Sequence, residues 1–171
     1  ATLKQVVMKE KIDLVVSNGD YCPFHYRNLW FKHCYGTDVE LWEVIGKRKY
    51  QALVLKDLRA GERALRALHA LPVPVVTVLG NVDHIVSDSQ DVLKPSGKKY
   101  WAWDWQDFMT PLLAKYPNIY RIDYRSFRFK EFVFLGAYGG TNPGKPRSKA
   151  FRLHRAKLDR LFGTFPLERR L

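Results

Sequence analysis

The chain has 171 residues, of which 46% are hydrophobic and 14% aromatic, so it can bury the core of one domain. This composition excludes a disordered or low-complexity chain, and the longest apolar runs fall far short of the ~20 residues that cross a bilayer. The formal net charge of +12 is uneven, because residues 1–90 hold 12 Lys and Arg against 10 Asp and Glu, whereas residues 91–171 hold 17 against 7. A positive field of this kind attracts nucleotides and nucleic acid, although a solvated basic helix would give the same counts.

The first part of the chain has the pattern of helices that alternate with a buried strand. Residues 3–12 have the spacing of an amphipathic helix, and residues 14–16 form a short apolar run typical of a buried strand. Two further helices are predicted over residues 39–45, with Asp38 as the cap, and over residues 50–71.

A second buried strand, rich in valine, is predicted over residues 72–79. Both predicted strands follow a helix, and both end in polar turns, at residues 17–20 and 80–84. Strands that are joined through helices run parallel, and polar side chains that follow them gather at the carboxyl edge of the sheet. The sequence therefore predicts an α/β domain with a mostly parallel sheet and a site along that edge.

The second part of the chain is predicted to contain a helix, two strands and a basic helix. The first helix is expected over residues 101–115, and the two strands over residues 119–122 and 127–138, paired antiparallel. A loop rich in glycine and proline then precedes the basic helix, expected over residues 148–161.

The turns after the two buried strands carry the most specific motifs, Gly19-Asp20 and Gly80-Asn81-Val82-Asp83. In this order they resemble two of the five motifs of the calcineurin-like metallophosphoesterase superfamily, and residues 135–140 resemble the strand and glycine turn that follow in that family. The resemblance implies an α/β fold in which a metallophosphoesterase-like β-sandwich is flanked by helices. Because the family's Asp-x-His and Gly-His-x-His motifs are absent, residues 1–171 are expected to be a single, incomplete domain that lacks its first strand and its C-terminal strands.

The same resemblance implies a centre of two divalent metal ions, drawn from Mn, Fe, Zn or Mg. It makes Asp20 and Asn81 the metal ligands, because a carboxylate can bridge two cations and an amide can bind one without adding charge. Asn81 would also contact the phosphate. The alternatives are a turn or helix-cap role for Asp20 and an Asx-turn role for Asn81.

The implied substrate is a phosphate ester, such as a nucleotide or nucleic acid, and the candidates for binding it besides Asn81 are Lys98, Lys99 and His154. Val82 stands where the family has a histidine that assists the leaving group, so hydrolysis of a phosphodiester is expected in preference to a monoester. His84 lies two positions further on and is the catalytic candidate. The alternative is an inactive scaffold or a nucleic-acid-binding module of the same fold.

Two other clusters of residues suggest binding sites. Cys22 and Cys34 are too few for a disulfide scaffold, which places the chain by default in a reducing cytoplasm, with no membrane partner. With His25 and His33 they have the ligand types of a structural zinc site, although buried or capping roles are favoured.

The second cluster is aromatic and follows Lys98 and Lys99. Its rings could stack on nucleotide bases or pack against the sheet, and its members are Tyr100, Trp101, Trp103 and Trp105.

Overall fold

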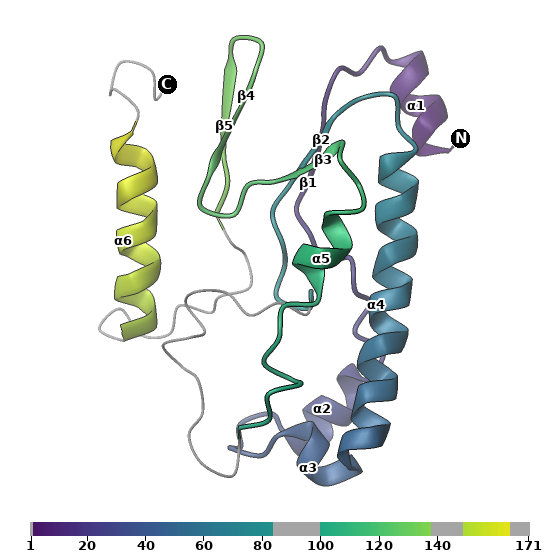
Figure 1. Cartoon of the computed structure of the whole chain (residues 1–171), viewed down its shortest axis with the longest axis vertical. Coiled ribbons are helices and arrows are strands. Elements are labelled where there is room, and N and C mark those ends of the chain that lie inside the picture. The colour runs from purple at the N-terminus through teal and green to yellow at the C-terminus, as the bar shows by residue number, and fades with distance from the viewer. Residues whose placement is uncertain (1, 84–99, 138–148, 165–171) are drawn as a thin grey trace.

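The structure is a computed structural model that describes residues 2–83, 100–137 and 149–164 (Figure 1). Its helices, in chain order, are α1 (Leu3–Lys9), α2 (Arg27–His33), α3 (Leu41–Ile45), α4 (Lys47–His69), α5 (Met109–Leu113) and α6 (Lys149–Gly163). Its strands are β1 (Val15–Ser17), β2 (Val75–Thr77), β3 (Ile119–Arg121), β4 (Ser126–Phe129) and β5 (Phe132–Leu135).

Strands β1, β2 and β3 form a parallel sheet in that order. Val75 of β2 lies in register with Val15 of β1 and with Ile119 of β3. The predicted parallel arrangement of the first two strands is therefore confirmed, and the carboxyl ends of all three strands meet at one edge of the sheet.

The expected antiparallel pairing between residues 119–122 and 127–138 is wrong. β3 pairs parallel with β2, and the antiparallel partners are β4 and β5, which form a hairpin of their own. Lys130 at the tip of this hairpin has a φ of 51°, the left-handed conformation that lets a tight turn reverse the chain. The later segment thus folds back on itself before it can pair with β3.

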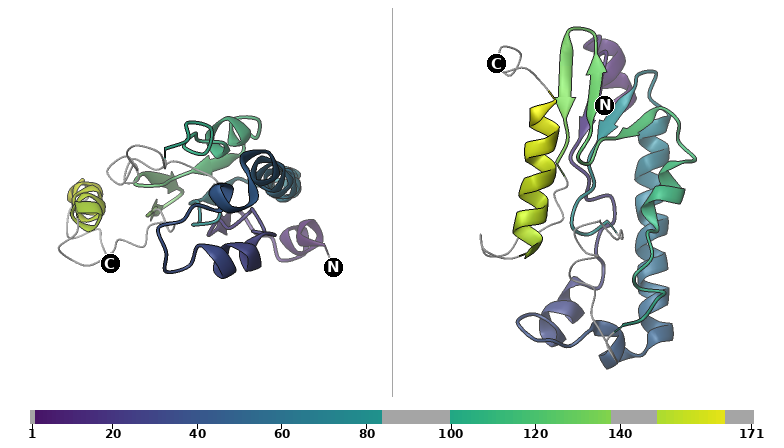
Figure 2. Two further views of the ribbon diagram at one scale, coloured as in Figure 1. Left: turned by 90° about the horizontal axis from the view of Figure 1, so that it is seen from below. Right: turned by 60° about the vertical axis from the view of Figure 1, so that its left-hand side comes forward.

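The long helix α4 supplies most of the cover on one side of the parallel sheet (Figure 2). Its buried residues recur every three or four positions, at Val54, Asp57, Gly61 and Leu65. Leu65 packs in a core cluster with β2 and α5, through Val75 and Met109, and all three side chains are fully buried. The helix predicted over residues 50–71 is thus confirmed as part of α4.

The hairpin approaches the other face of the parallel sheet. The ring of Tyr120 on β3 lies 4.8 Å from that of Phe127 on β4. A small cavity of about 270 Å³ is lined by Val16 and Val76 from the sheet and by Phe134 from the hairpin.

The helix expected over residues 101–115 is confined to Met109–Leu113. The irregular stretch before this helix ends at Asp107. The Asp107 carboxylate accepts hydrogen bonds from the backbone N–H of Met109 at 2.9 Å and of Thr110 at 2.8 Å, in the first turn of the helix. The aromatic residues of that stretch are used in packing: Trp101 lies 5.6 Å from Trp42.

The described residues are thus a mixed α/β assembly with one small parallel and one small antiparallel sheet. Within the three described ranges, no helix combines the length and the apolar character needed to span a membrane.

Candidate functional site

The polar turns after β1 and β2 meet backbone to backbone at the carboxyl edge of the parallel sheet. Gly19 has a φ of +78°, and a Cβ added to it would lie 2.4 Å from the backbone nitrogen of Gly80. A Cβ on Gly80 would lie 1.8 Å from Oδ1 of Asp20. Only glycine fits either position, so the two glycines of the sequence motifs are explained by the close approach of the turns.

Asp83 fastens the two turns to each other. Its carboxylate accepts hydrogen bonds from the backbone N–H groups of Asp20 at 3.0 Å, Cys22 at 3.1 Å and Gly80 at 2.9 Å. Only 2% of the residue is exposed, and this burial raises the pKa of the Asp83 carboxyl, while the backbone donors oppose the shift. Asp83 is therefore an internal brace of the site.

Tyr21 ties the same turn back to the strands. Its buried hydroxyl donates to Oγ of Ser17 at 2.8 Å and lies 2.6 Å from Oγ1 of Thr77, so it bridges the ends of β1 and β2. Burial raises the pKa of the Tyr21 phenol, so the hydroxyl stays protonated. The Asp83 carboxylate and the Tyr21 hydroxyl together hold the turn that contains Asp20.

Asp20 and Asn81 are both exposed on these turns, and together we call them the strand-end site. Gly80 lies between them, with the Asp20 carboxylate against its Cα. No hydrogen bond joins either side chain to another residue of the described ranges. The structure therefore brings the two predicted metal ligands to the same edge and leaves their oxygens accessible.

The donor chemistry of the strand-end site fits a hard divalent cation, because carboxylate and amide oxygens are ligands that such ions accept. Within residues 2–83, 100–137 and 149–164, however, no group of three His, Cys, Asp or Glu side chains could hold a metal ion. Asp20 and Asn81 can thus supply part of a ligand set, and two ions need further donors.

Three of the predicted site residues, His84, Lys98 and Lys99, lie outside the described residues. His154 is on α6, where its Nδ1 lies 2.7 Å from the hydroxyl of Tyr124. The described contacts therefore give His154 a role in holding α6 against the end of β3.

The alternative zinc cluster does not form. Cys22 and Cys34 are buried in two different core clusters, the first beside Leu65 and the second beside Leu41. His25 instead contacts the fully buried Asp57 of α4, whose carboxylate accepts from the His25 backbone N–H at 3.2 Å and also pairs with its ring Nδ1.

The sequence analysis did not identify Asp123, which connects the strand-end site to β3. One oxygen of Asp123 accepts a hydrogen bond from the backbone N–H of Leu79 at 3.0 Å, just before Gly80, and the other pairs with Arg121. The sequence does place this carboxylate just after the strand predicted at residues 119–122. It could have been assigned to the site only if that strand had been predicted to pair parallel with β2.

Comparisons of the chain with profiles of protein families, with curated proteins and with solved structures found no match.

Proposed function

We propose that the chain carries the metal-ligating strand ends of a metal-dependent phosphoesterase that hydrolyses phosphodiesters. The observation that supports this best is the contact between the turns at Gly19 and Gly80, which brings the exposed residues Asp20 and Asn81 to the same edge of the sheet. A parallel sheet that presents one ligand from each of two adjacent strands is the arrangement that the metallophosphoesterase resemblance implies.

The proposed fold is a β-sandwich flanked by helices. It is supported by the approach of the hairpin to the parallel sheet, through Tyr120 and Phe127. Val16 and Phe132, on the two sheets, remain 56% and 59% exposed, so both leave apolar surface that further strands of a sandwich would cover.

Each residue of the strand-end site has a distinct task in this proposal. Asp20 and Asn81 would hold divalent ions such as Mn²⁺, Fe²⁺, Zn²⁺ or Mg²⁺, which supply Lewis acidity toward a phosphate ester when bound. Asn81 adds an oxygen donor without a second negative charge, so an anionic ester is repelled less. Val82 has no proton to give, which favours esters whose leaving group needs little protonation and therefore diesters over alkyl monoesters.

An inactive module of the same fold is the second candidate. It is favoured by one observation, that the described ranges hold no group of three ligating side chains. Such a module would bind nucleic acid or a protein partner without hydrolysis.

Paramagnetic Mn²⁺ and an aryl phosphodiester test the proposal together. Mn²⁺ is expected to broaden the amide NMR signals of the two turns, and hydrolysis of bis(p-nitrophenyl) phosphate should depend on the metal. Asp20→Asn should abolish both effects, whereas Glu131→Gln, at an exposed carboxylate in the hairpin turn, should leave them unchanged.

Broadening at the turns without hydrolysis would contradict the enzyme and support the inactive module. If the signals of Gly19–Cys22 and Gly80–Asp83 are not selectively broadened, the proposal of a metal site at these turns is wrong.

A further inference from the structure

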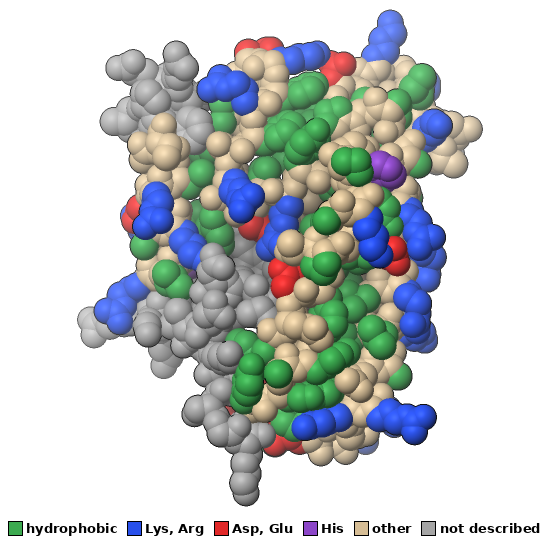
Figure 3. All heavy atoms as spheres, in the orientation of Figure 1, with side chains coloured by type: hydrophobic (Ala, Val, Ile, Leu, Met, Phe, Trp, Pro, Cys, Tyr) green, Lys and Arg blue, Asp and Glu red, His purple; other side chains and the backbone are tan. Residues whose placement is uncertain are grey.

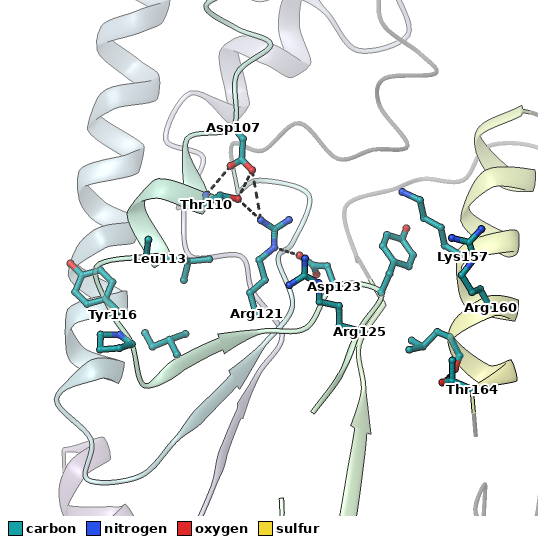
Figure 4. Close-up of a pocket in the computed structure, with 15 residues that line it drawn as sticks. Asp107, Thr110, Leu113, Tyr116, Arg121, Asp123, Arg125, Lys157, Arg160 and Thr164 are labelled. Carbon is teal, nitrogen blue, oxygen red and sulfur yellow. Dashed lines mark hydrogen bonds and ion pairs between the residues drawn. The ribbon is translucent and has the colours of Figure 1, made fainter. Parts of the chain in front are cut away.

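A cavity of about 800 Å³ lies between the end of β3, α5 and α6 (Figure 4). Its basic lining comes from two sides: Arg121 and Arg125 from the end of β3 and the turn after it, and Lys157 and Arg160 from α6. In the close-up, Arg121 points toward Asp107 and Thr110, and Lys157 extends from α6 into the space between the two elements. We call this cavity the basic pocket.

The positive charge of the basic pocket is only partly neutralised from within. Its two carboxylates, Asp107 and Asp123, both pair with Arg121, which also donates to Oγ1 of Thr110 at 2.7 Å. Arg125 and Arg160 have no carboxylate partner in the described part of the chain. The surface view shows Lys and Arg side chains on α6 and on the facing end of the sheet (Figure 3).

The basic pocket is also lined by apolar side chains, among them Leu113, Pro117 and Leu161, and by polar ones such as Thr164. A volume of about 800 Å³ is within the range of sites for small molecules, roughly 300–1,000 Å³. A ligand that suits this pocket therefore has an apolar ring system and more than one negative charge, because cations face it from both walls. Guanidinium groups bind phosphate oxygens with two parallel hydrogen bonds, which favours phosphate as the anion.

We infer that the basic pocket binds the phosphate groups of a nucleotide, either free or as part of a nucleic-acid strand. The pocket borders the strand-end site through Asp123, which binds both Arg121 and the backbone just before Gly80. Binding of a nucleotide in the basic pocket is independent of the proposed function. Only the further step, that the same nucleotide is hydrolysed at the strand-end site, rests on the proposed function.

Titration calorimetry with ADP in the presence of EDTA tests the binding without any metal. Arg125→Gln and Arg160→Gln should each weaken ADP binding about tenfold, the effect expected from the loss of a charged hydrogen bond. Arg152→Gln is the matched control, because it removes the same charge from an exposed position of α6 that does not line the pocket, and it should change the affinity less than about twofold.

Two further probes define the ligand. Pyrophosphate should bind more weakly than ADP, because it lacks the apolar ring. A single-stranded oligonucleotide that binds more tightly than ADP, with the same dependence on Arg125 and Arg160, would identify a nucleic-acid strand as the source of the phosphates.

Two outcomes would overturn the inference: no binding of ADP or oligonucleotide at about 1 mM ligand, or equal losses in all three arginine variants, which would indicate general attraction to a basic surface. Asp20→Asn separates this inference from the proposed function. It should leave ADP binding in EDTA intact, even if no metal-dependent hydrolysis is found.

Discussion

Gly80 has no room for a side chain at the strand-end site. An added methyl group would overlap Oδ1 of Asp20, at 1.8 Å, and crowd the Asp20 backbone nitrogen at 2.8 Å. Gly80→Ala should therefore lower the free energy of unfolding by about 2 kcal/mol or more, measured by urea denaturation. Gly163→Ala meets nothing within 4 Å and should change it by less than about 0.5 kcal/mol; equal effects of the two changes would contradict the contact between the turns.

Asp83 should make stability depend on pH in an unusual direction. Burial raises its folded-state pKa above the ordinary value of 3.8, so the folded protein holds this proton more tightly than the unfolded chain does. The Asp83 contribution to the free energy of unfolding is therefore greatest below the unfolded pKa and falls as the pH rises through the folded pKa.

Urea denaturation at several pH values checks this prediction. The stability of the wild-type chain relative to Asp83→Asn should decrease as the pH rises from about 3.5 to 7, because the variant lacks the titrating group. A difference that stays constant over this range would show that the backbone donors cancel the effect of burial.

At the scale of elements, α4 anchors the loop that follows β1 at two successive turns of the helix. Gly61 lets Cys22 approach, since a Cβ there would lie 3.1 Å from the Cys22 sulfur. One turn earlier, the fully buried carboxylate of Asp57 holds the backbone and ring of His25. Gly61 thus has a packing role within α4, and the helix continues through it.

The pairing of His25 with Asp57 predicts that the effects of removing the two partners are not additive. His25→Ala leaves a buried carboxylate with only a backbone donor and should lower the free energy of unfolding by about 2–3 kcal/mol. Adding Asp57→Ala should recover part of that loss, because the unpaired charge is then gone. Thermal and urea unfolding of the single and double variants measure this; a double variant that loses the sum of both single effects would contradict the pairing.

At the scale of the whole molecule, α6 is held to the rest of the protein through Tyr124. The Tyr124 hydroxyl meets His154, and the ammonium group of Lys157 lies 5.0 Å from the centre of the Tyr124 ring. Tyr124→Leu should therefore speed amide hydrogen exchange in α6 while β1, β2 and β3 remain protected. Tyr35→Leu, at a tyrosine that is 65% exposed, should leave exchange in α6 unchanged; unchanged exchange in Tyr124→Leu as well would mean that other contacts hold the helix.

The sequence predicted those elements whose own residues carry the signal. The apolar runs around Val15 and Val75, and the helical pattern of residues 50–71, are local patterns that burial preserves, so β1, β2 and α4 formed close to where they were expected. The helix expected over residues 101–115 does not extend over that range, because Trp101 and Trp103 pack against α3 and α4 in an irregular stretch. The helix begins only after Asp107, whose carboxylate accepts hydrogen bonds from its first turn. Aromatic side chains at helical spacing could not distinguish these two structures.

The sequence by itself determined that polar residues follow two parallel strands, and hence that Asp20 and Asn81 share one edge of the sheet, because connections through helices align the strand ends. Only the tertiary structure showed that the Asp83 carboxylate joins the two turns, since its three backbone donors come from both of them. The basic pocket likewise depends on how α6 lies against the end of β3. Contacts between segments far apart in the chain leave no local pattern in the sequence, so burial and pairing at these positions became visible only in the folded molecule.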